Sequence, residues 1–397
     1  WLIILLCEIM SRRIAYCTPS LYIAGGVERV LTTKANYFAD VLGYEIYIIL
    51  TDGKGKEPYY KLSPKIKVIH LDINFEELWH LSFLRKIPVY LKKQRVFKRK
   101  LTEVLMDIKP DITVSLLRRE INFITSIKDG SKKVGEIHVN KLNYRNFEAN
   151  DTNIVKELFS KWWMWNLLSK LKKLDKFVVL SHEDKGYWHE LDNVEVISNP
   201  LPFIPRKECT LDSHRVIAVG RYVYQKGFDL LLDAWKIVSK KHPTWELHVY
   251  GNGDKTPYVE QVRNSDIKNC FLEDAVNNID EKYAESSIFV LSSRFEGFGM
   301  VLAEAMSCGL SCVSFACPCG PKDIINDGVD GCLVENGNIE VLAGKICYLI
   351  ENEDIRKEMG KQAKIHIQRY NEENVMRMWQ ILFDKLLEKP QDNNSHG

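Results

Sequence analysis

The chain has 397 residues, a formal net charge of +2 and 45% hydrophobic residues. A chain of this length exceeds one ordinary hydrophobic core and therefore predicts two domains. This hydrophobic content, together with 27% charged residues, is typical of a soluble globular protein. The near-neutral charge balance excludes a protein that binds polyanions over its whole surface, but it allows local charged patches.

Ten cysteines are scattered along the chain without a CxxC pair. This usage favours reduced thiols in a cytosol over a disulfide framework. The nearest grouping that resembles a metal site is Cys308, Cys312, Cys317 and Cys319. It has no histidine partners nearby, so we expect structural thiols there and no metal.

The first nine residues are apolar, which raises the question of a signal peptide or membrane anchor. They lack a basic n-region and are far shorter than a membrane span of ~20 residues. Met10, followed by Ser11-Arg12-Arg13, has the form of a natural start, so we interpret residues 1–9 as an upstream extension. We expect no other segment to span a bilayer.

In chain order, the first half alternates short apolar strands with helices. Strands are predicted at 13–17, 45–50, 66–71, 112–117, 133–138, 176–180 and 194–197, and helices near 26–42, 89–108, 119–129, 155–173 and 182–190. Short apolar runs separated by helices predict a parallel sheet covered on both faces.

Prolines at 200, 202 and 205 interrupt the alternation, and the polar residues 206–213 are typical of a linker. Strands are predicted again at 215–219, 246–250, 269–272, 288–291, 311–315 and 332–334, with final helices at 353–368 and 371–388. The sequence therefore predicts two Rossmann-like domains facing across a cleft, over 10–200 and 201–370. A C-terminal helix over 371–388 follows and can cross back to the first domain. Ligands of such domains bind at the carboxyl edges of the strands.

Residues 288–309 carry the strongest functional signal. A predicted strand leads into a Glu-Gly-Phe-Gly turn and a helix that ends where Gly309 can close it. The helix N-terminus offers unpaired N–H groups and the positive end of a dipole, which together form an anion site. Glu296 and Glu304 are eight residues apart, and glutamates at this spacing are often merely solvated. Here the turn places both beside an anion site, where a carboxylate can accept hydrogen bonds from sugar hydroxyls. The candidate donor-binding residues are Glu296, Gly297, Phe298, Gly299, Met300, Val301 and Glu304.

Two further loops point to the same kind of ligand. Gly220-Arg221 and Lys226 lie in one predicted strand-to-helix loop, where both cations can clamp a diphosphate, although solvated loop cations are an equal alternative. Gly25 and Gly26 follow the first predicted strand and allow a ligand to approach the backbone closely. Neither half contains a dinucleotide fingerprint, so a dehydrogenase is not expected.

Taken together, these motifs resemble the retaining GT-B glycosyltransferases of family four. The resemblance covers nearly the whole chain, from Gly25-Gly26-Val27-Glu28-Arg29 to the segments 320–325 and 328–334. It implies that Arg221 and Lys226 bind the donor diphosphate, that Glu296 holds the hydroxyls of the transferred sugar and that Glu304 holds the ribose. It also places His138 near the reacting face of the sugar, although a strand-end histidine can be purely structural. Phe271-Leu272-Glu273 departs from the family pattern, in which a glycine is more usual, and this affects base recognition.

The resemblance also implies a mechanism. Negative charge grows on the departing nucleotide diphosphate, and Arg221, Lys226 and the amides of residues 299–301 are aimed at it. The family retains the anomeric configuration through front-face attack, so no protein nucleophile is required. The sequence has no Asp-x-Asp motif, and we expect neither a metal nor another cofactor.

The acceptor side is indicated by a basic segment. Residues 85–100 contain eight basic residues and no acidic one, on a helix with an apolar stripe. Such a helix suits an anionic membrane surface, as does the Trp- and Lys-rich segment 161–173, although a solvated basic face is the alternative. Nucleic acid is not expected as a partner, because no recognition motif accompanies the charge.

The leading hypothesis is a cytoplasmic enzyme, peripheral at the inner face of the cell membrane. It is expected to transfer a sugar from a nucleotide-diphosphate sugar, UDP-linked, to a surface-polysaccharide or lipid-linked glycan acceptor. A GT-B-type nucleotide-sugar epimerase and a non-catalytic nucleotide-sugar-binding protein are the alternatives. The presence of Arg221, Lys226, Glu296 and Glu304 together argues against the non-catalytic one.

Overall fold

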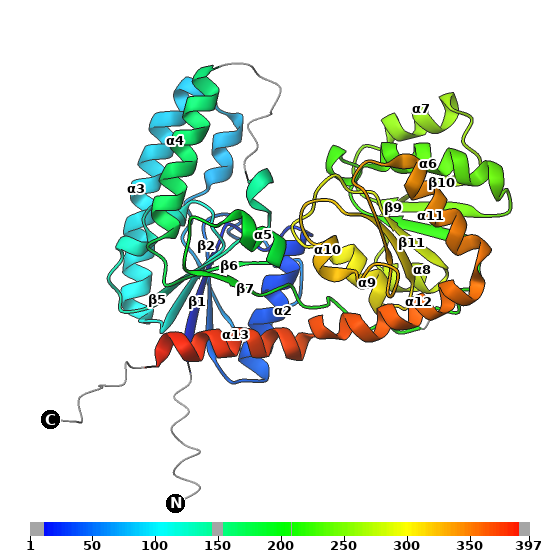
Figure 1. Ribbon diagram of the computed structural model, residues 1–397. Helices are drawn as coiled ribbons and strands as arrows, with labels where there is room; N and C mark the ends of the chain where they lie inside the picture. The colour runs from blue at the N-terminus through cyan, green and yellow to red at the C-terminus, as the bar shows by residue number, and fades with distance from the viewer. Residues whose placement is uncertain (1–11, 145–153, 208, 389–397) are drawn as a thin grey trace, which may run out of the picture.

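The computed structural model describes residues 12–144, 154–207 and 209–388, which form two α/β domains (Figure 1). The first domain holds a seven-stranded sheet in the order β3-β2-β1-β4-β5-β6-β7, with every pair of neighbours parallel. The strands are β1 (Arg13–Thr18), β2 (Glu45–Leu50), β3 (Lys67–His70), β4 (Ile112–Ser115), β5 (Lys132–Glu136), β6 (Lys176–Val179) and β7 (Val194–Val196). The helices are α2 (Gly26–Asp40), α3 (Phe83–Ile108), α4 (Ile154–Leu171) and α5 (His182–Tyr187), with 3-10 turns η1 (Phe75–His80), η2 (Glu120–Asn122), η3 (Ile124–Ser126) and η4 (Lys141–Asn143).

The second domain repeats this plan with six parallel strands in the order β10-β9-β8-β11-β12-β13. They are β8 (Arg215–Val219), β9 (Glu246–Gly251), β10 (Cys270–Asp274), β11 (Ile288–Leu291), β12 (Ser311–Phe315) and β13 (Cys332–Val334). The helices and turns are η5 (Tyr224–Lys226), α6 (Phe228–Lys241), α7 (Thr256–Asn264), α8 (Ile279–Ala284), α9 (Met300–Ser307), α10 (Pro321–Ile324), α11 (Ile339–Glu351), α12 (Glu353–His366), η6 (Ile367–Tyr370) and α13 (Glu372–Leu387).

Helices cover both faces of each sheet, and successive residues of a strand pack against opposite layers of helices. In β1, Ala15 packs into the cluster formed with α3 and α4, while its neighbour Ile14 packs into the cluster formed with α2 and α13. In the second domain, Val216 faces α6 and α11, while Ile217 faces α9. Because successive strand residues point to opposite faces, an apolar run is needed wherever both faces are buried. The prediction of two Rossmann-like domains is confirmed.

The last helix crosses back to the first domain. Figure 1 shows α13 running from the second domain along the base of the first. Its Phe383 ring lies 5.6 Å from Phe38 of α2, and Trp379 is fully buried in the same cluster. Apolar packing by α13 therefore ties the end of the chain to the first domain.

The predicted helix over 119–129 is wrong, because the segment forms only the short turns η2 and η3. The buried Glu120 carboxylate turns back to accept hydrogen bonds from Ser115 Oγ at 2.8 Å and from the Arg118 amide at 3.0 Å. Phe123 then leaves helical geometry with φ of −149°. A side chain that satisfies the preceding loop competes with helix formation. The helix predicted from residue 89 begins earlier, at Phe83, and carries Pro88 inside it.

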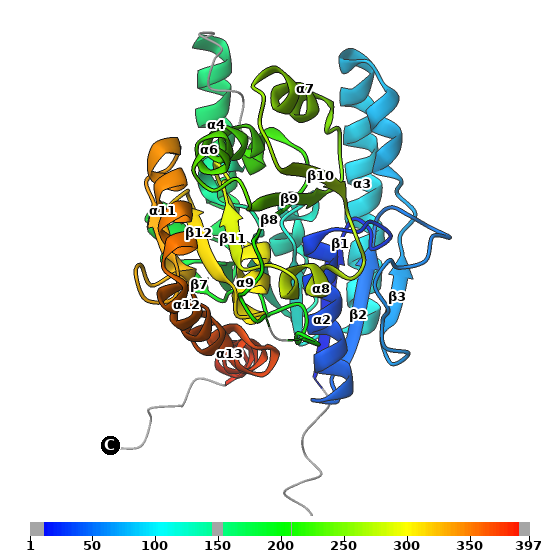
Figure 2. The same ribbon diagram turned by 90° about the vertical axis from the view of Figure 1, so that its right-hand side faces the viewer.

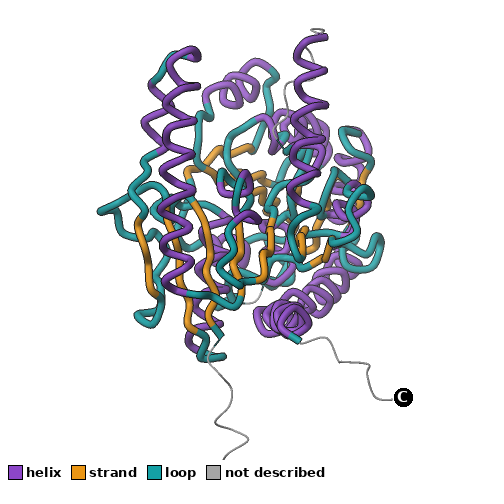
Figure 3. Tube along the Cα trace, turned by 90° about the vertical axis from the view of Figure 1, so that its left-hand side faces the viewer, coloured by secondary structure: helices purple, strands orange, loops and turns teal. Residues whose placement is uncertain are grey.

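Helices α3 and α4 extend beyond the sheet of the first domain. They overlap in Figure 1, but the views from either side show them as two separate columns on the same end of the molecule (Figure 2, Figure 3). Among the helices of the described part of the chain, none is long and apolar enough to cross a membrane.

Candidate active site

Both sheets reverse their strand order at the first strand, between β1 and β4 and between β8 and β11. Such a switch point opens a crevice at the carboxyl ends of the strands. The loop after β8 carries Lys226 and the loop after β11 carries Glu296, so the topology brings these two side chains together although 70 residues separate them.

Lys226 and Glu296 form an ion pair where these two loops meet. Lys226 Nζ lies 2.6 Å from Glu296 Oε1, and Ser293 Oγ donates to the same carboxylate oxygen at 2.6 Å. The Lys226 side chain is 13% exposed and the Glu296 side chain 7%. The pair is largely desolvated, so its electrostatic interaction is stronger than that of a surface pair.

Glycine permits the close approach of the two loops. Gly227 has φ of +61°, and a Cβ atom there would lie 2.1 Å from the Ser292 carbonyl oxygen. Any side chain at this position would separate the loops. Arg294 adds a bidentate pair to Asp229, with Nη1–Oδ1 at 2.8 Å and Nη2–Oδ2 at 2.6 Å. The two loops are thus held together directly after Lys226.

Helix α9 begins at Met300, directly after Gly299, which has φ of +96°. In its first turn the Leu302 N–H bonds the Gly299 carbonyl oxygen at 2.9 Å, so the amides that lack an intrahelical acceptor are those up to Val301, at the positive end of the helix dipole. Phe298 is buried, and its ring packs edge-on against Tyr370 at 5.2 Å. The Phe298 ring therefore belongs to the core of the second domain and anchors the turn.

Glu304 lies one helical turn into α9 and is buried. Its Oε1 is 3.2 Å from Arg29 Nη1 of the first domain, and its Oε2 accepts from the Tyr283 hydroxyl at 3.1 Å. Burial raises the pKa of the Glu304 carboxyl, and Arg29 opposes that rise only in part. Glu304 is thus the point at which α9 is bound to the first domain.

The first domain also contacts the Glu296 turn. Asn140 Nδ2 donates to the Glu296 carbonyl oxygen at 2.6 Å, and Asn140 is 1% exposed. A Cβ atom on Gly297 would lie 2.4 Å from the His138 carbonyl oxygen. The absence of a side chain at Gly297 therefore lets the strand-end segment of the first domain touch the turn that carries Glu296.

A buried chain of charges lies behind His138. His138 Nε2 lies 3.2 Å from Glu136 Oε1, and Lys34 Nζ lies 2.5 Å from the same oxygen. Burial pushes the pKa of the Glu136 carboxyl up, but Lys34 and His138 pull it down further, to about 2. Lys34 Nζ also lies 4.2 Å from the centre of the Trp379 ring on α13. The Lys34–Glu136 pair therefore lies directly behind His138, at the end of β5.

Among the described residues, the remaining predicted ones surround this cluster without pairing with its charges. Arg221 is exposed, and within the described ranges its guanidinium forms no ion pair with an acidic side chain. At Gly220 a Cβ would lie 3.1 Å from the aliphatic carbons of Lys226, which pack against it. Glu28 covers Gly25, with its carboxylate 2.1 Å from a Cβ built there, while Gly26 borders open space.

Sequence reasoning missed four contributors to the site: Ser293, Asn140, Tyr283 and the role of Arg29. Arg29 stands in the glycine motif of the first loop, and Asn140 lies two residues beyond His138, so proximity in the chain was a usable signal for both. Nothing local marks Tyr283, because its contact with Glu304 depends on how α8 packs beside α9.

No group of three His, Cys, Asp or Glu side chains within the described ranges is placed to hold a metal ion. The grouped cysteines 308, 312, 317 and 319 are buried. Burial raises the pKa of the Cys317 and Cys319 thiols, so both are held as neutral thiols.

Comparison with known proteins places this geometry in context. Residues 204–366 match the family model described as "Glycosyl transferases group 1". An uncharacterized glycosyltransferase of Haemophilus influenzae is 27% identical over 93% of this chain and 99% of its own length. The GalNAc-α-(1→4)-GalNAc-α-(1→3)-diNAcBac-PP-undecaprenol α-1,4-N-acetyl-D-galactosaminyltransferase of Campylobacter jejuni is 27% identical over 90% of this chain and 94% of its own.

Among solved structures, a variant of TarM from S. aureus in complex with fondaparinux, α-GlcNAc-glycerol and UDP superposes with a TM-score of 0.72. It is 18% identical and covers 94% of this chain and 100% of its own. The fold is the GT-B arrangement, and the comparisons as a whole support a glycosyltransferase.

Proposed function

We propose that this chain is a retaining glycosyltransferase of family four. It transfers a sugar from a nucleotide-diphosphate sugar, UDP-linked, to a surface-polysaccharide or lipid-linked glycan. The observation that carries the proposal is the Lys226–Glu296 pair at the switch point, 2.6 Å between charged atoms, beside the N-terminus of α9. Cation, carboxylate and helix amides meet where a diphosphate and the sugar attached to it can be bound together.

Each residue has a role in this mechanism. Lys226, Arg221 and the first-turn amides of α9 stabilise the negative charge that grows on the departing diphosphate. Glu296 accepts hydrogen bonds from the hydroxyls of the transferred sugar, and His138 faces the reacting side. The leaving phosphate oxygen takes the proton of the acceptor hydroxyl as the new bond forms on the same face. No protein nucleophile takes part, and configuration is retained.

Glu304 is the proposed ribose ligand. A UDP ribose would bind the carboxylate that Arg29 and Tyr283 hold in this structure. A solved relative of the same fold binds UDP, and another relative acts on an undecaprenol-linked glycan, which supports the donor and the acceptor class respectively. The proposal is tested with a panel of UDP-, GDP- and ADP-linked sugars scored by nucleotide release, with and without lipid-linked glycan. If no donor of the panel releases its nucleotide, with or without the lipid-linked glycan, the proposal is contradicted.

Transfer is expected to survive excess EDTA. The cations at the diphosphate come from Lys226 and Arg221, so a divalent ion is not needed to neutralise the leaving group. The measurement is nucleotide release before chelation, after it, and after Mg²⁺ or Mn²⁺ is restored. Complete loss of activity that either ion restores would contradict this mechanism.

Membrane association is the second element of the proposal, at the inner face of the cell membrane. On α3 the side chains of Arg85, Lys92, Arg95, Lys98 and Arg99 are exposed, and on α4 Trp162 and Trp165 are 55% and 66% exposed. Trp and basic side chains together favour an anionic interface. Two of the eight basic residues predicted to face the membrane make contacts within the protein instead. Lys93 donates to the Ile73 and Asn74 carbonyl oxygens and pairs with Glu77. Lys100 donates to the Leu71 carbonyl oxygen.

Replacing Arg85, Lys92, Arg95 and Lys98 with Gln is expected to lower binding to phosphatidylserine vesicles at least about tenfold at low salt, since each cation near such a surface contributes ~1 kcal/mol. Co-sedimentation measures the effect. The matched control replaces four exposed cations away from α3 and α4: Lys185, Lys207, Lys240 and Arg263. Equal loss in both variants, or a wild type that ignores the vesicles, would show that α3 is only a solvated face.

A further inference from the structure

The connection between β2 and β3 departs from the pattern of the rest of the sheet. Residues 51–66 run from one strand to the other without a helix, whereas α2 links β1 to β2 and α6 links β8 to β9. A crossover helix normally covers the face of a parallel sheet. Its absence leaves the face of β2 and β3 beside α2 partly uncovered, and a cavity lies between the irregular segment and the strands.

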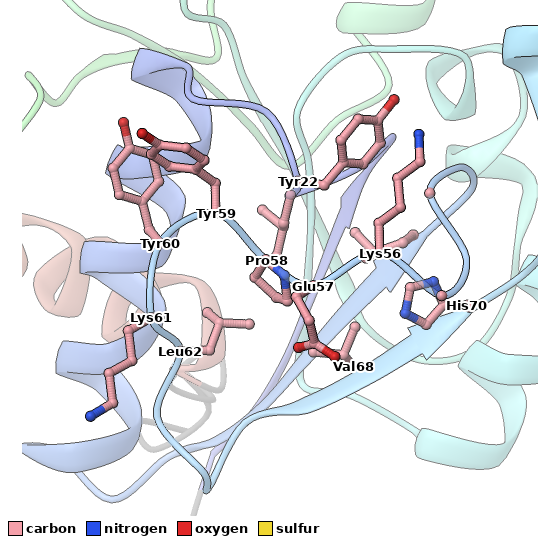
Figure 4. Close-up of a pocket in the computed structure, with 14 residues that line it drawn as sticks. Tyr22, Lys56, Glu57, Pro58, Tyr59, Tyr60, Lys61, Leu62, Val68 and His70 are labelled. Carbon is pink, nitrogen blue, oxygen red and sulfur yellow. The ribbon is translucent and has the colours of Figure 1, made fainter.

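This cavity, the tyrosine pocket, has a volume of ≈ 600 Å³. Such a volume falls within the range of ligand sites, ~300–1,000 Å³. Its lining includes the apolar Leu50, Leu62 and Val68 together with three tyrosines, two lysines, a glutamate and a histidine, most of which are labelled in Figure 4. The wall residues used below are Tyr22, Lys56, Glu57, Tyr59, Tyr60 and Lys61.

The aromatic walls are held in place. The Tyr22 hydroxyl donates to Glu76, and Lys56 Nζ lies 3.8 Å from the centre of the Tyr22 ring. A Cβ on Gly53 would lie 2.6 Å from that ring, so the glycine makes room for it. Tyr59 is tied to the loop after β1 by a 2.8 Å bond from its amide to the Leu21 carbonyl. The pocket is therefore built before any ligand arrives.

The pocket adjoins the proposed transfer site. Leu21 and Tyr22 of its wall lie in the same loop as Gly25, which precedes α2 and Arg29. Arg29, which is paired with Glu304, and Glu304 itself both act electrostatically on the Tyr60 phenol, whose pKa burial raises. Figure 4 shows the hydroxyl ends of Tyr22, Tyr59 and Tyr60 pointing to one side of the pocket. The pocket therefore lies beside the loop of the first domain that borders the proposed donor site.

We propose that the tyrosine pocket binds a sugar residue of the acceptor glycan, beyond the residue that receives the new bond. Tyr59 is 55% exposed and forms an edge-to-face pair with Tyr60, with ring centres 5.0 Å apart, so one ring face is open to stack on a sugar ring. Lys61 and Glu57 supply a donor and an acceptor for hydroxyls. This inference rests on the proposed transfer function, and it makes the substrate a preassembled oligosaccharide.

Saturation-transfer NMR with maltotriose and chitotriose tests the pocket without any reaction. We expect the wild type and Tyr59→Phe to saturate the sugar protons, because the ring is retained, and Tyr59→Ala to lose the signal. The matched control is Tyr348→Ala, an exposed tyrosine on α11 that is 41% exposed. No signal from either trisaccharide with the wild type, or an unchanged signal in Tyr59→Ala, overturns the proposal.

A kinetic comparison separates this proposal from the transfer function itself. With lipid-linked glycan as acceptor, Tyr59→Ala is expected to raise the acceptor KM at least about tenfold and to move the donor KM by far less. Equal changes in both constants contradict a separate acceptor subsite. A wild type that binds the trisaccharides but transfers no sugar leaves the sugar site standing and removes the proposed function.

Discussion

Replacing Lys226 with Ala is expected to lower the rate of sugar transfer by ~10²–10³, the usual cost of losing one preorganised charge at a developing anion. Glu296→Ala is expected to lose most activity as well, because it removes both the proposed partner of the sugar hydroxyls and the carboxylate that holds Lys226, 2.6 Å away. Initial rates at saturating donor measure both effects.

The control for this prediction is Lys241→Ala. Lys241 also pairs with a carboxylate of the second domain, Glu351 at 2.6 Å, but both side chains are exposed and the pair lies at the end of α6 that leads into β9, away from the loops that carry Lys226 and Glu296. Because the Lys226–Glu296 pair is largely buried, each single variant must also be checked by thermal melting. Near-normal turnover in Lys226→Ala and Glu296→Ala, with normal melting, would remove both residues from the site.

Glu136→Gln is expected to destabilise the fold by ~3–5 kcal/mol, because it leaves the Lys34 ammonium buried without its counter-charge. The two side chains are 1% and 2% exposed. The double variant Lys34→Met, Glu136→Leu should recover most of the loss, since apolar side chains of similar volume can replace a buried pair. Urea unfolding measures all three proteins. A double variant as unstable as the single one would contradict the account.

The same pair gives the fold a pH dependence of known sign. The pKa of Glu136 is lowered from its ordinary value of 4.5 to about 2 in the folded chain. Its contribution to the free energy of unfolding is therefore complete above pH 4.5 and is lost as the pH falls toward 2. The double variant lacks Glu136, so this part of the acid slope should be absent from it.

Much of the fold could be read from the sequence because its signals are local. The run at 288–291 is apolar throughout and the run at 45–50 is apolar after Glu45, and both are strands of parallel sheets. Gly299 and Gly309 stand at the two ends of α9, and both adopt positive φ, at +96° and +81°. Turn and cap chemistry of this kind depends only on neighbouring residues.

The contacts that assemble the site could not be predicted from the sequence, because they join segments that are far apart in the chain. Arg29 meets Glu304 across 275 residues, and Asn140 meets Glu296 across 156. Lys34 lies on an amphipathic helix, where a lysine is usually solvated, and only the packing of α13 and the end of β5 buries it. The hydrophobic periodicity of each domain does not predict which of its residues contact the other domain.

Long-range contacts also explain why the helix predicted over 119–129 does not form and why Lys93 and Lys100 bind backbone carbonyls. The segment 119–129 has a helical pattern, yet the Glu120 side chain satisfies the end of β4 instead. Lys93 and Lys100 continue a basic face in sequence, but the loop after β3 folds under them and offers its carbonyls. In both cases tertiary hydrogen bonds overrode a local pattern.

The measurement that tests the central claim most directly follows the anomeric carbon of the donor. The enzyme is incubated with a UDP-sugar labelled with ¹³C at the anomeric position and with a lipid-linked glycan, and NMR follows the label. We expect the label to enter a new glycosidic bond on the acceptor with the configuration it had in the donor. Label that appears only in an epimerised nucleotide sugar or in free sugar, or that stays in unchanged donor, would contradict a retaining glycosyltransferase.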